Sequence, residues 1–268
     1  MNQHSKQGTA LITGASAGIG ATYAQRLAAR GHDLILVARD AARMQQLAER
    51  LKARHGVQVE VLPADLTQRG DLLAVEQRLR TDAAITLLVN NAGMAVQGQL
   101  IDADIDRYEA MIQLNVISVT RLAAAAAAAF GGRGSGTIVN IASVLALAPE
   151  LFNGTYSGTK AYVLNLSQSM QQELAPRGVR VQVVLPGATR TEIWDRSGGS
   201  VDALPAEMLM EVEDLVDAAL SGLDQGEVVT IPSLPDRADW QAMEAARHAL
   251  GPNLSRNRPA ERYLSHAG

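Results

Sequence analysis

The sequence predicts an α/β fold in which helices cover both faces of an open, parallel β-sheet. Short runs of Val, Ile and Leu recur along the chain, and a longer segment with helical periodicity follows nearly every one. Strands that are apolar throughout are typical of a parallel sheet buried on both sides. We therefore expect strands at 9–13, 34–38, 57–62, 85–89, 137–141, 179–185 and 228–231. The expected helices lie at 19–30, 40–55, 72–81, 107–130, 159–175 and 212–223.

Local signals support these elements in chain order. The first strand, TALIT, breaks at a glycine cluster, and Gly31 ends the first helix. In the polar second helix, Met44, Leu47 and Leu51 share one face. The glycine-rich stretch 131–136 is typical of a turn between the long helix and the fifth strand.

Two segments depart from this repeat. Residues 188–210 show no clear periodicity, and a long irregular segment in a compact domain is often a functional lid. From about residue 232 the chain continues as an extension with one expected helix at 237–250. No linker-like tract interrupts the chain, so we expect a single domain over 1–268.

Composition excludes several classes of function. The 268 residues include no cysteine, which excludes disulfides, thiolate metal sites and a cysteine nucleophile, and we expect no metal site. With 24 Lys+Arg against 28 Asp+Glu the net charge is −4, so we expect no nucleic-acid or membrane partner. The N-terminus has no apolar signal core, and the apolar run 122–130 is shorter than the ~20 residues that span a bilayer. We therefore expect a cytoplasmic protein.

A glycine-rich turn, TGASAGIG at 13–20, joins the first strand to the first helix. Small residues there let the backbone approach a phosphate, and a helix N-terminus favours negative charge. A tight turn without a ligand would have the same composition. The stretch 14–18 also matches the G-x-S-x-G elbow of serine hydrolases, but the preceding residues are too few for the earlier strands of that fold. The late histidines that it needs, His248 and His266, lie in the polar tail.

A tyrosine and a lysine stand four residues apart at Tyr156 and Lys160. With five tyrosines and three lysines, about 0.06 such pairs are expected by chance. On a helix the two side chains share a face, and an ammonium beside a phenol lowers the pKa of the phenol, so that it can act as a general acid or base. Ser143 follows the fifth strand, at the sheet edge where ligands bind, and a serine that caps a helix or turn would occupy the same place. Asn115 is unusual inside a helix.

Together these residues resemble the short-chain dehydrogenase/reductase family from about residue 9 to 231. TGASAGIG is similar to the TGxxxGxG coenzyme turn of the family, and Asn90-Asn91-Ala92-Gly93 to its NNAG element. Asn115, Ser143 and the Tyr156–Lys160 pair resemble its catalytic set. The resemblance implies a single Rossmann-type, doubly wound domain with an NAD(P)(H)-dependent oxidoreductase activity that interconverts a carbonyl and an alcohol.

The resemblance also implies a role for each matching residue. Tyr156 would exchange a proton with the substrate oxygen, Lys160 would lower the pKa of Tyr156 and bind the nicotinamide ribose, and Ser143 would hold the substrate oxygen. Asn115 would anchor a water-mediated proton path to Lys160. The implied coenzyme contacts are Gly14, Ser16, Gly18, Ile19, Gly20, Arg39, Asp65, Leu66, Asn91, Ala92, Gly93, Tyr156, Lys160, Pro186, Gly187 and Thr191.

The coenzyme is expected to be NADP(H) rather than NAD(H). NAD-preferring members carry an acidic residue at the end of the second strand, where this chain has Ala38 followed by Arg39, a partner for a 2′-phosphate. Asp40 leaves an alternative open, because its carboxylate would bind a ribose hydroxyl if the strand ended later. Ala17, a basic position in some NADP-binding members, is neutral here.

The segments above the nicotinamide are expected to select the substrate. They comprise 94–97, 144–152 and 188–210, and their apolar residues Leu145, Leu147, Leu151, Phe152, Ile193 and Trp194 favour a medium-sized hydrophobic carbonyl or alcohol. Ordinary packing would give the same composition, and Arg190 or Arg196 would instead suit an acidic substrate. The helices carrying Asn115 and Lys160 are expected to form a homodimer or homotetramer. The alternative function is a nucleotide-binding regulatory or interaction protein on the same fold.

Overall fold

The computed structural model describes residues 7–198, 200 and 204–264, without the side chains of residues 195 and 196. It divides into two compact units, Met1–Pro232 and Ser233–Gly268. The first contains a sheet whose strands are β1 (Thr9–Thr13), β2 (Asp33–Ala38), β3 (Val59–Pro63), β4 (Ile85–Asn90), β5 (Gly136–Ile141), β6 (Val179–Val184) and β7 (Val229–Thr230). Its main helices are α1 (Gly18–Ala29), α2 (Ala41–His55), α3 (Arg69–Thr81), α4 (Ile105–Ile112), α5 (Val119–Arg133), α6 (Gly154–Leu174) and α8 (Val212–Asp224).

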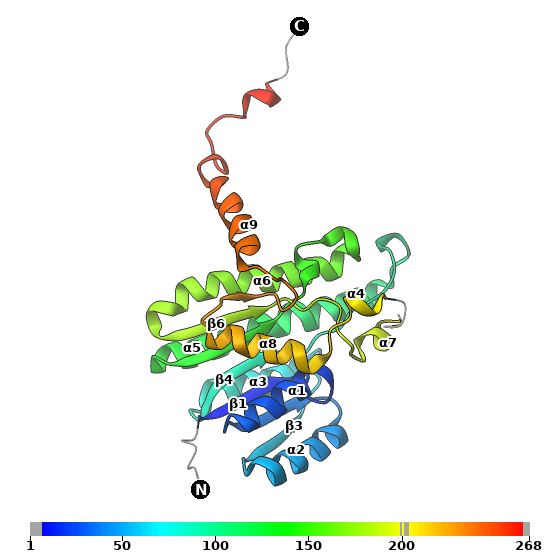
Figure 1. Ribbon diagram of the computed structural model, residues 1–268, viewed down its shortest axis with the longest axis vertical. Coiled ribbons are helices and arrows are strands. Elements are labelled where there is room, and N and C mark those ends of the chain that lie inside the picture. Colours follow the sequence, from blue (N-terminus) through cyan, green and yellow to red (C-terminus); the bar gives the residue numbers. More distant parts are fainter. Residues whose placement is uncertain (1–6, 199, 201–203, 265–268) are drawn as a thin grey trace. The chain divides into compact units, whose positions relative to one another are not determined.

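The predicted fold class is confirmed. The seven strands follow the order β3-β2-β1-β4-β5-β6-β7, and every neighbouring pair is parallel. Helices α1, α2 and α8 pack on one face of the sheet, and α3, α5 and α6 pack on the other (Figure 1). The strand interiors supply residues to both cores, which explains why they are apolar throughout.

The strand order reverses between β1 and β4. From β1 the chain adds β2 and β3 on one side, and then crosses back to add β4 on the other. In open α/β sheets, ligands bind at such a switch point, outside the carboxyl ends of the strands. The glycine-rich turn follows β1 and Asn91 follows β4, so both segments meet at this edge.

The long helix predicted at 107–130 is longer and less regular than expected. It runs from α4 to α5 through one π-helical segment, Gln113–Ser118, which contains Asn115. Within the described residues this run, Ile105–Arg133, is long and apolar enough to cross a membrane by length and composition alone. In this fold Leu122, Ala126 and Phe130 are instead buried against the sheet.

Of the helix ends that differ from the sequence-based expectation, two have a clear local cause. Helix α6 begins at Gly154 rather than at residue 159, because Asn153 caps it by accepting a hydrogen bond from the Tyr156 N–H. Helix α5 continues to Arg133, so half of the stretch expected to be a turn is helical. It ends at Gly134, whose φ of 74° is in the left-handed region that favours glycine.

The two ends of the irregular segment at 188–210 lie side by side. Its ends are joined by a parallel bridge between Thr189 and Met210, and it contains the short helix α7 (Ile193–Ser197). Residues 199 and 201–203 lie outside the described residues.

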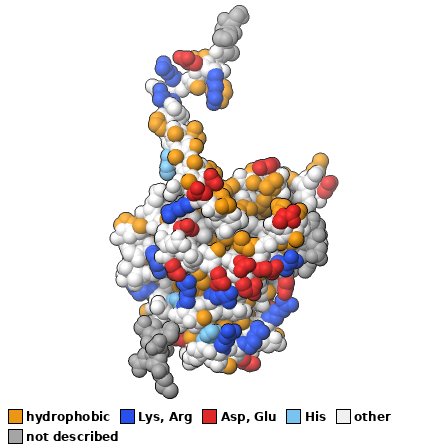
Figure 2. Space-filling model, in the orientation of Figure 1, with side chains coloured by type: hydrophobic (Ala, Val, Ile, Leu, Met, Phe, Trp, Pro, Cys, Tyr) orange, Lys and Arg blue, Asp and Glu red, His pale blue; other side chains and the backbone are white. Residues whose placement is uncertain are grey.

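On the face drawn in Figure 2, acidic and basic side chains are interspersed rather than segregated by sign.

The second unit contains helix α9 (Arg237–Ala249) and two short 3-10 turns, Gly251–Asn253 and Glu261–Tyr263. Asp236 caps α9 by accepting a hydrogen bond from the Ala238 N–H. No described residue of these three elements is buried. The expected helix at 237–250 is therefore present, and most of its residues are exposed, with Trp240 and Glu244 half-buried.

Candidate active site

The glycine-rich turn leaves the N-terminus of α1 open to a ligand. Gly14 and Gly18 have φ values of 67° and 51°, which side chains rarely adopt. The N-cap residue is Ala17, and no described side chain accepts a hydrogen bond from the first turn of α1. A Cβ atom at Gly20 would clash with the Gly14 carbonyl and the Asn91 amide. The turn is thus shaped to present backbone N–H groups to an anion.

Asn91 holds this turn against β4. Its Nδ2 donates to the carbonyl oxygens of Thr13, at 2.9 Å, and Gly14, at 3.3 Å. In return the Thr13 hydroxyl accepts hydrogen bonds from the N–H groups of Asn91 and Ala92, both at 3.0 Å. The carboxyl ends of β1 and β4 are therefore fixed to each other by side chains.

A cleft of about 600 Å³ opens at this edge of the sheet. Eleven of the residues predicted to contact the coenzyme line it: Gly14, Ser16, Gly18, Ile19, Arg39, Asp65, Leu66, Asn91, Ala92, Gly93 and Thr191. Gly20, Tyr156, Lys160, Pro186 and Gly187 are not among its lining residues. Gly20 lies beneath the turn, close to the Gly14 carbonyl. Pro186 lies instead near the predicted catalytic residues, since its carbonyl accepts a hydrogen bond from the Ser143 hydroxyl at 3.5 Å.

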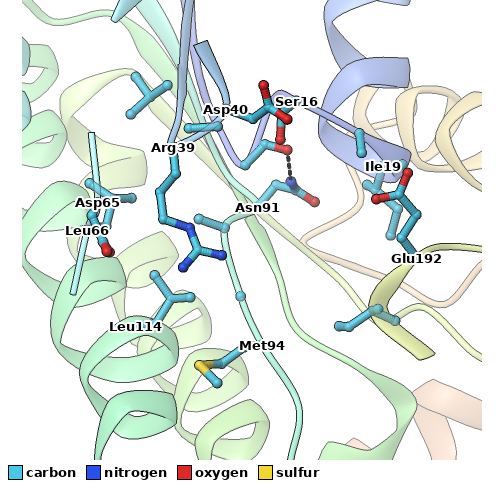
Figure 3. A pocket seen from close by; sticks show the side chains of 18 of the residues that line it. Ser16, Ile19, Arg39, Asp40, Asp65, Leu66, Asn91, Met94, Leu114 and Glu192 are labelled. Atoms are coloured by element: carbon cyan, nitrogen blue, oxygen red, sulfur yellow. Dashed lines mark hydrogen bonds between the residues drawn. The ribbon is translucent and has the colours of Figure 1, made fainter. Parts of the chain in front are cut away.

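Arg39 and Asp40 occupy different situations at the end of β2. The Arg39 side chain extends across the cleft between Asp65 and Asn91 (Figure 3), and it forms no hydrogen bond or ion pair with another described residue. The Asp40 carboxylate caps α2 by accepting from the Arg43 N–H at 3.0 Å, and it also lies 3.4 Å from Arg43 Nε. A cation is thus available in the cleft, whereas the neighbouring carboxylate is already engaged.

The irregular segment crosses the edge of the same cleft. Arg43 Nη1 donates to both carboxylate oxygens of Glu192, at 2.8 and 2.9 Å, which ties α2 to this segment. Thr191, Glu192 and Ile193 all line the cleft, and the sequence-based set included only Thr191 for the coenzyme. Glu192 was missed because an exposed glutamate in an irregular segment carries no local signal.

The predicted catalytic residues meet at the carboxyl end of β5. Tyr156 and Lys160 lie one turn apart on α6, and the ammonium Nζ is 5.7 Å from the centre of the tyrosine ring. Lys160 Nζ donates to the Ile141 carbonyl at 3.1 Å, which fixes the lysine to β5. Ser143, two residues further along, accepts a hydrogen bond from the Leu145 N–H at 3.2 Å. All three side chains are buried.

Burial controls the protonation of this pair. It raises the pKa of Tyr156 to about 12, although a side-chain hydrogen bond with Ser143 acts in the opposite direction. Burial also lowers the pKa of Lys160 to about 8. The sequence-based argument expected the ammonium to lower the phenol pKa, but desolvation is the larger effect in this chain. At neutral pH Tyr156 therefore carries its proton.

Asn115 lies in the π-helical segment, and three hydrogen bonds hold its side-chain amide. Its Oδ1 accepts from the Met94 N–H at 2.9 Å, and its Nδ2 donates to the Met94 carbonyl at 2.8 Å and to Thr159 Oγ1 at 3.2 Å. A Cβ atom at Gly93 would lie 3.3 Å from Asn115 Oδ1 and 3.5 Å from Lys160 Nζ. The glycine thus lets both side chains approach the backbone after β4.

Apolar side chains pack around Tyr156. Val96, Tyr108 and Met111 are buried with it, and Leu145 and Phe152 pack against this cluster. The Phe152 ring meets the Tyr156 ring edge to face, with 5.4 Å between ring centres. Of the other residues expected to select the substrate, Ile193 lines the coenzyme cleft, Trp194 donates to the Thr189 carbonyl at 2.8 Å, and Leu147 and Leu151 are exposed.

The arginines suggested for an acidic substrate gain no support. Arg190 Nε donates to Glu211 at 3.0 Å and is already paired. The side chain of Arg196 lies outside the described residues. Within the described part of the chain, no three His, Asp or Glu side chains are grouped so that they could hold a metal ion.

Comparison with known proteins agrees with this geometry. The family model for short chain dehydrogenases matches residues 8–200. The chain belongs to the short-chain dehydrogenase family. This short-chain dehydrogenase is 31% identical over 223 residues to an uncharacterized oxidoreductase of Staphylococcus saprophyticus, a match that covers 83% of this chain and 93% of the relative.

Two solved structures are more similar still. A short-chain dehydrogenase from Sphingobium yanoikuyae, solved in complex with NADPH, shares 54% identity and a TM-score of 0.93, covering 96% of this chain and 99% of that one. A bulky-bulky ketone specific alcohol dehydrogenase from Comamonas testosteroni shares 48% identity and a TM-score of 0.90, covering 97% and 100%. This short-chain dehydrogenase is therefore an oxidoreductase by family.

Proposed function

We propose that this chain is an NADP(H)-dependent oxidoreductase that interconverts a medium-sized hydrophobic carbonyl and its alcohol. One observation carries the proposal: Tyr156, which burial keeps protonated at neutral pH, lies with buried Ser143 and Lys160 at the sheet edge beside a cleft suited to a dinucleotide. A phenol in this state is a proton donor, so the chain is proposed to act mainly as a reductase.

The residues present fit a bound dinucleotide. The glycine turn with its uncapped helix N-terminus suits a diphosphate, and Arg39 suits a 2′-phosphate. Asp65 and Leu66 would lie beside the adenine, and Asn91, Ala92, Gly93 and Thr191 along the rest of the coenzyme. When bound, the coenzyme supplies or accepts the hydride.

The protein residues would bind the substrate oxygen and move its proton. Tyr156 would donate its phenolic proton to the carbonyl oxygen during reduction and remove a proton from the alcohol during oxidation. Ser143 would hold the same oxygen, since Ser143 lies close enough to Tyr156 to lower the pKa of the phenol. Lys160 would bind the nicotinamide ribose, and Asn115 would anchor a water-mediated path to Lys160. Pro186 and Gly187 would lie beside the nicotinamide.

The preference for NADP(H) over NAD(H) rests on the end of β2. Arg39 is unpaired among the described residues, while Asp40 is occupied by the α2 cap and by Arg43. The Sphingobium yanoikuyae relative was solved with NADPH, which supports the same choice here.

The proposed substrate class rests on the apolar cluster around Tyr156. Val96, Leu145 and Phe152 offer apolar contacts beside the phenol. The Comamonas testosteroni relative is specific for bulky-bulky ketones, which supports a ketone with two large substituents. We also propose a homodimer or homotetramer through the helices that carry Asn115 and Lys160, where Ile117 and Tyr162 are exposed, and a cytoplasmic location.

The test is NADPH oxidation, followed by its absorbance, with a panel of aryl alkyl ketones. The wild-type protein should reduce at least one ketone with NADPH, and Tyr156→Phe should abolish turnover while leaving the NADPH dissociation constant within about 2-fold. Tyr156→Phe removes only the phenolic hydroxyl, so the fold and the cleft are retained. Normal turnover in this variant would refute the mechanism. Wild-type protein that binds NADPH but reduces no carbonyl would favour the regulatory alternative.

A further inference from the structure

The segment that follows β4, residues 94–98, has no regular secondary structure, yet its main chain is held at several points. Asn115 binds both the N–H and the carbonyl of Met94. The Tyr108 hydroxyl donates to the Gly98 carbonyl at 3.0 Å. Between these two anchors, the Val96 carbonyl accepts a hydrogen bond of 2.6 Å from Asn153 Nδ2. This last contact joins the segment to α6.

Asn153 uses the two ends of its amide for different purposes. Its Oδ1 accepts a hydrogen bond from the N–H of Tyr156 at 2.8 Å and so caps α6. Its Nδ2 reaches in the opposite direction to the Val96 carbonyl. One half-buried side chain therefore fixes the main chain of Tyr156 and the main chain of Val96 at the same time.

Val96 is itself part of the surroundings of Tyr156. It is 2% exposed and packs in the cluster that contains Tyr156, Tyr108 and Met111. A shift of the Val96 main chain would therefore change the space beside the phenolic ring. The adjacent Gln97 Nε2 lies 3.4 Å from Ser197 Oγ, so the same segment also touches helix α7.

We propose that Asn153 is a positioning residue that sets the separation between the 94–98 segment and Tyr156, and thereby the size of carbonyl that fits. The effect on substrate size rests on the proposed function, whereas the structural link from Asn153 to Val96 and Tyr156 does not. It is independent of the coenzyme, because Asn153 is not among the residues that line the coenzyme cleft. Asn153 acts through Tyr156 and Val96 and needs no contact with the reacting atoms.

Two substitutions separate the roles of this amide. Asn153→Ser retains an oxygen that can cap α6, but it is too short to reach the Val96 carbonyl. Asn153→Ala loses both contacts. Asp236→Ala serves as a matched control, because it removes the corresponding helix cap from α9, which belongs to the second unit.

The kinetic test uses acetophenone and butyrophenone, which differ in the size of one substituent. In Asn153→Ser we expect KM for butyrophenone to rise about 3- to 10-fold, the range of one lost hydrogen bond, with kcat within about 2-fold. The ratio of kcat/KM for butyrophenone to kcat/KM for acetophenone should change because KM for butyrophenone changes. In Asn153→Ala kcat should fall as well, since Tyr156 then loses its cap. The NADPH dissociation constant should not change, and Asp236→Ala should match the wild type.

Hydrogen exchange provides a readout that does not depend on turnover. Asn153→Ser should increase amide exchange in the peptide containing 94–98 and leave α6 unchanged. Unchanged exchange there, or an unchanged kcat/KM ratio in a variant that turns over, would overturn the role of Asn153. Failure of the wild-type protein to reduce any ketone would instead refute the proposed function, while the exchange result would still decide the structural link.

Discussion

Replacing Lys160 with methionine should stabilise the protein while abolishing its proposed activity. Lys160 is 6% exposed, and its one described hydrogen bond goes to the Ile141 carbonyl. Burial lowers its pKa from 10.5 to about 8, which corresponds to about 3 kcal/mol, since one pKa unit is ~1.36 kcal/mol. Methionine fills a similar volume without the charge. Losing the hydrogen bond costs about 1 kcal/mol, so Lys160→Met should gain about 2 kcal/mol at pH 7.

The sign of the pH dependence distinguishes this explanation from a simple packing effect. In the unfolded chain the lysine stays charged up to its ordinary pKa of 10.5, whereas in the folded protein it loses its proton near pH 8. Wild-type stability should therefore rise between pH 8 and 10.5, where folding releases a proton. The advantage of Lys160→Met should be largest below pH 8 and should disappear by pH 10.5.

Thermal unfolding without added coenzyme measures this difference. At pH 7 we expect a Tm about 4–8 °C above wild type, since ~1 kcal/mol shifts Tm by about 2–4 °C in a protein of this size. Lys52→Met is the matched control, because Lys52 is exposed on α2 and its removal should change Tm little at either pH. A lower Tm for Lys160→Met at pH 7, or an equal difference at pH 7 and pH 10, would refute the reasoning.

Two further predictions concern the coenzyme and the direction of reaction. Arg39→Glu should weaken NADPH about 10- to 100-fold and NADH less than about 3-fold in fluorescence titrations, because it replaces a cation that suits the 2′-phosphate. Asp40→Asn, which keeps the α2 cap, should leave the NADPH/NADH ratio unchanged; a selective loss of NADH would show that Asp40 binds the ribose. In pH profiles of kcat/KM, carbonyl reduction should fall above about pH 8 as Lys160 loses its proton. Alcohol oxidation should rise with pH, because the pKa of Tyr156 is about 12 and oxidation needs the phenolate. Reduction that increases from pH 8 to 10 would contradict this assignment.

The fold could be predicted almost entirely from the sequence, because its signals are local and repeated. Each buried strand is an apolar run, and the longer helices of the sheet have a periodic face, so the type of these elements was predicted even where their ends were not. Two of the errors lie at helix ends decided by single hydrogen bonds, and the short helix α7 was not predicted. Asn153 starts α6 five residues earlier than the apolar pattern indicates, and Gly134 ends α5 later than its glycines suggest.

The candidate site was predictable only where a short motif carries it. The glycine turn, Asn91 and the Tyr156–Lys160 pair have recognisable spacing, and the structure brings them to one edge of the sheet. Glu192 has no such spacing, because its partner Arg43 is 149 residues away in the sequence. Asn153 had a local signal, an asparagine three residues before Tyr156, but its second contact with Val96 depends on how two distant segments pack.

The choice between Arg39 and Asp40 illustrates how the start of a helix bears on a question that adjacent residues leave open. Both side chains reach the end of β2, and the sequence alone assigns either one to the ribose. Once α2 begins at Ala41, the carboxylate of Asp40 is placed to accept from the Arg43 N–H, a contact that contributes about 1 kcal/mol. Arg39 precedes the helix and gains no such partner among the described residues. The same helix start that occupies the carboxylate therefore leaves the guanidinium available, and the two effects together favour a phosphorylated ribose.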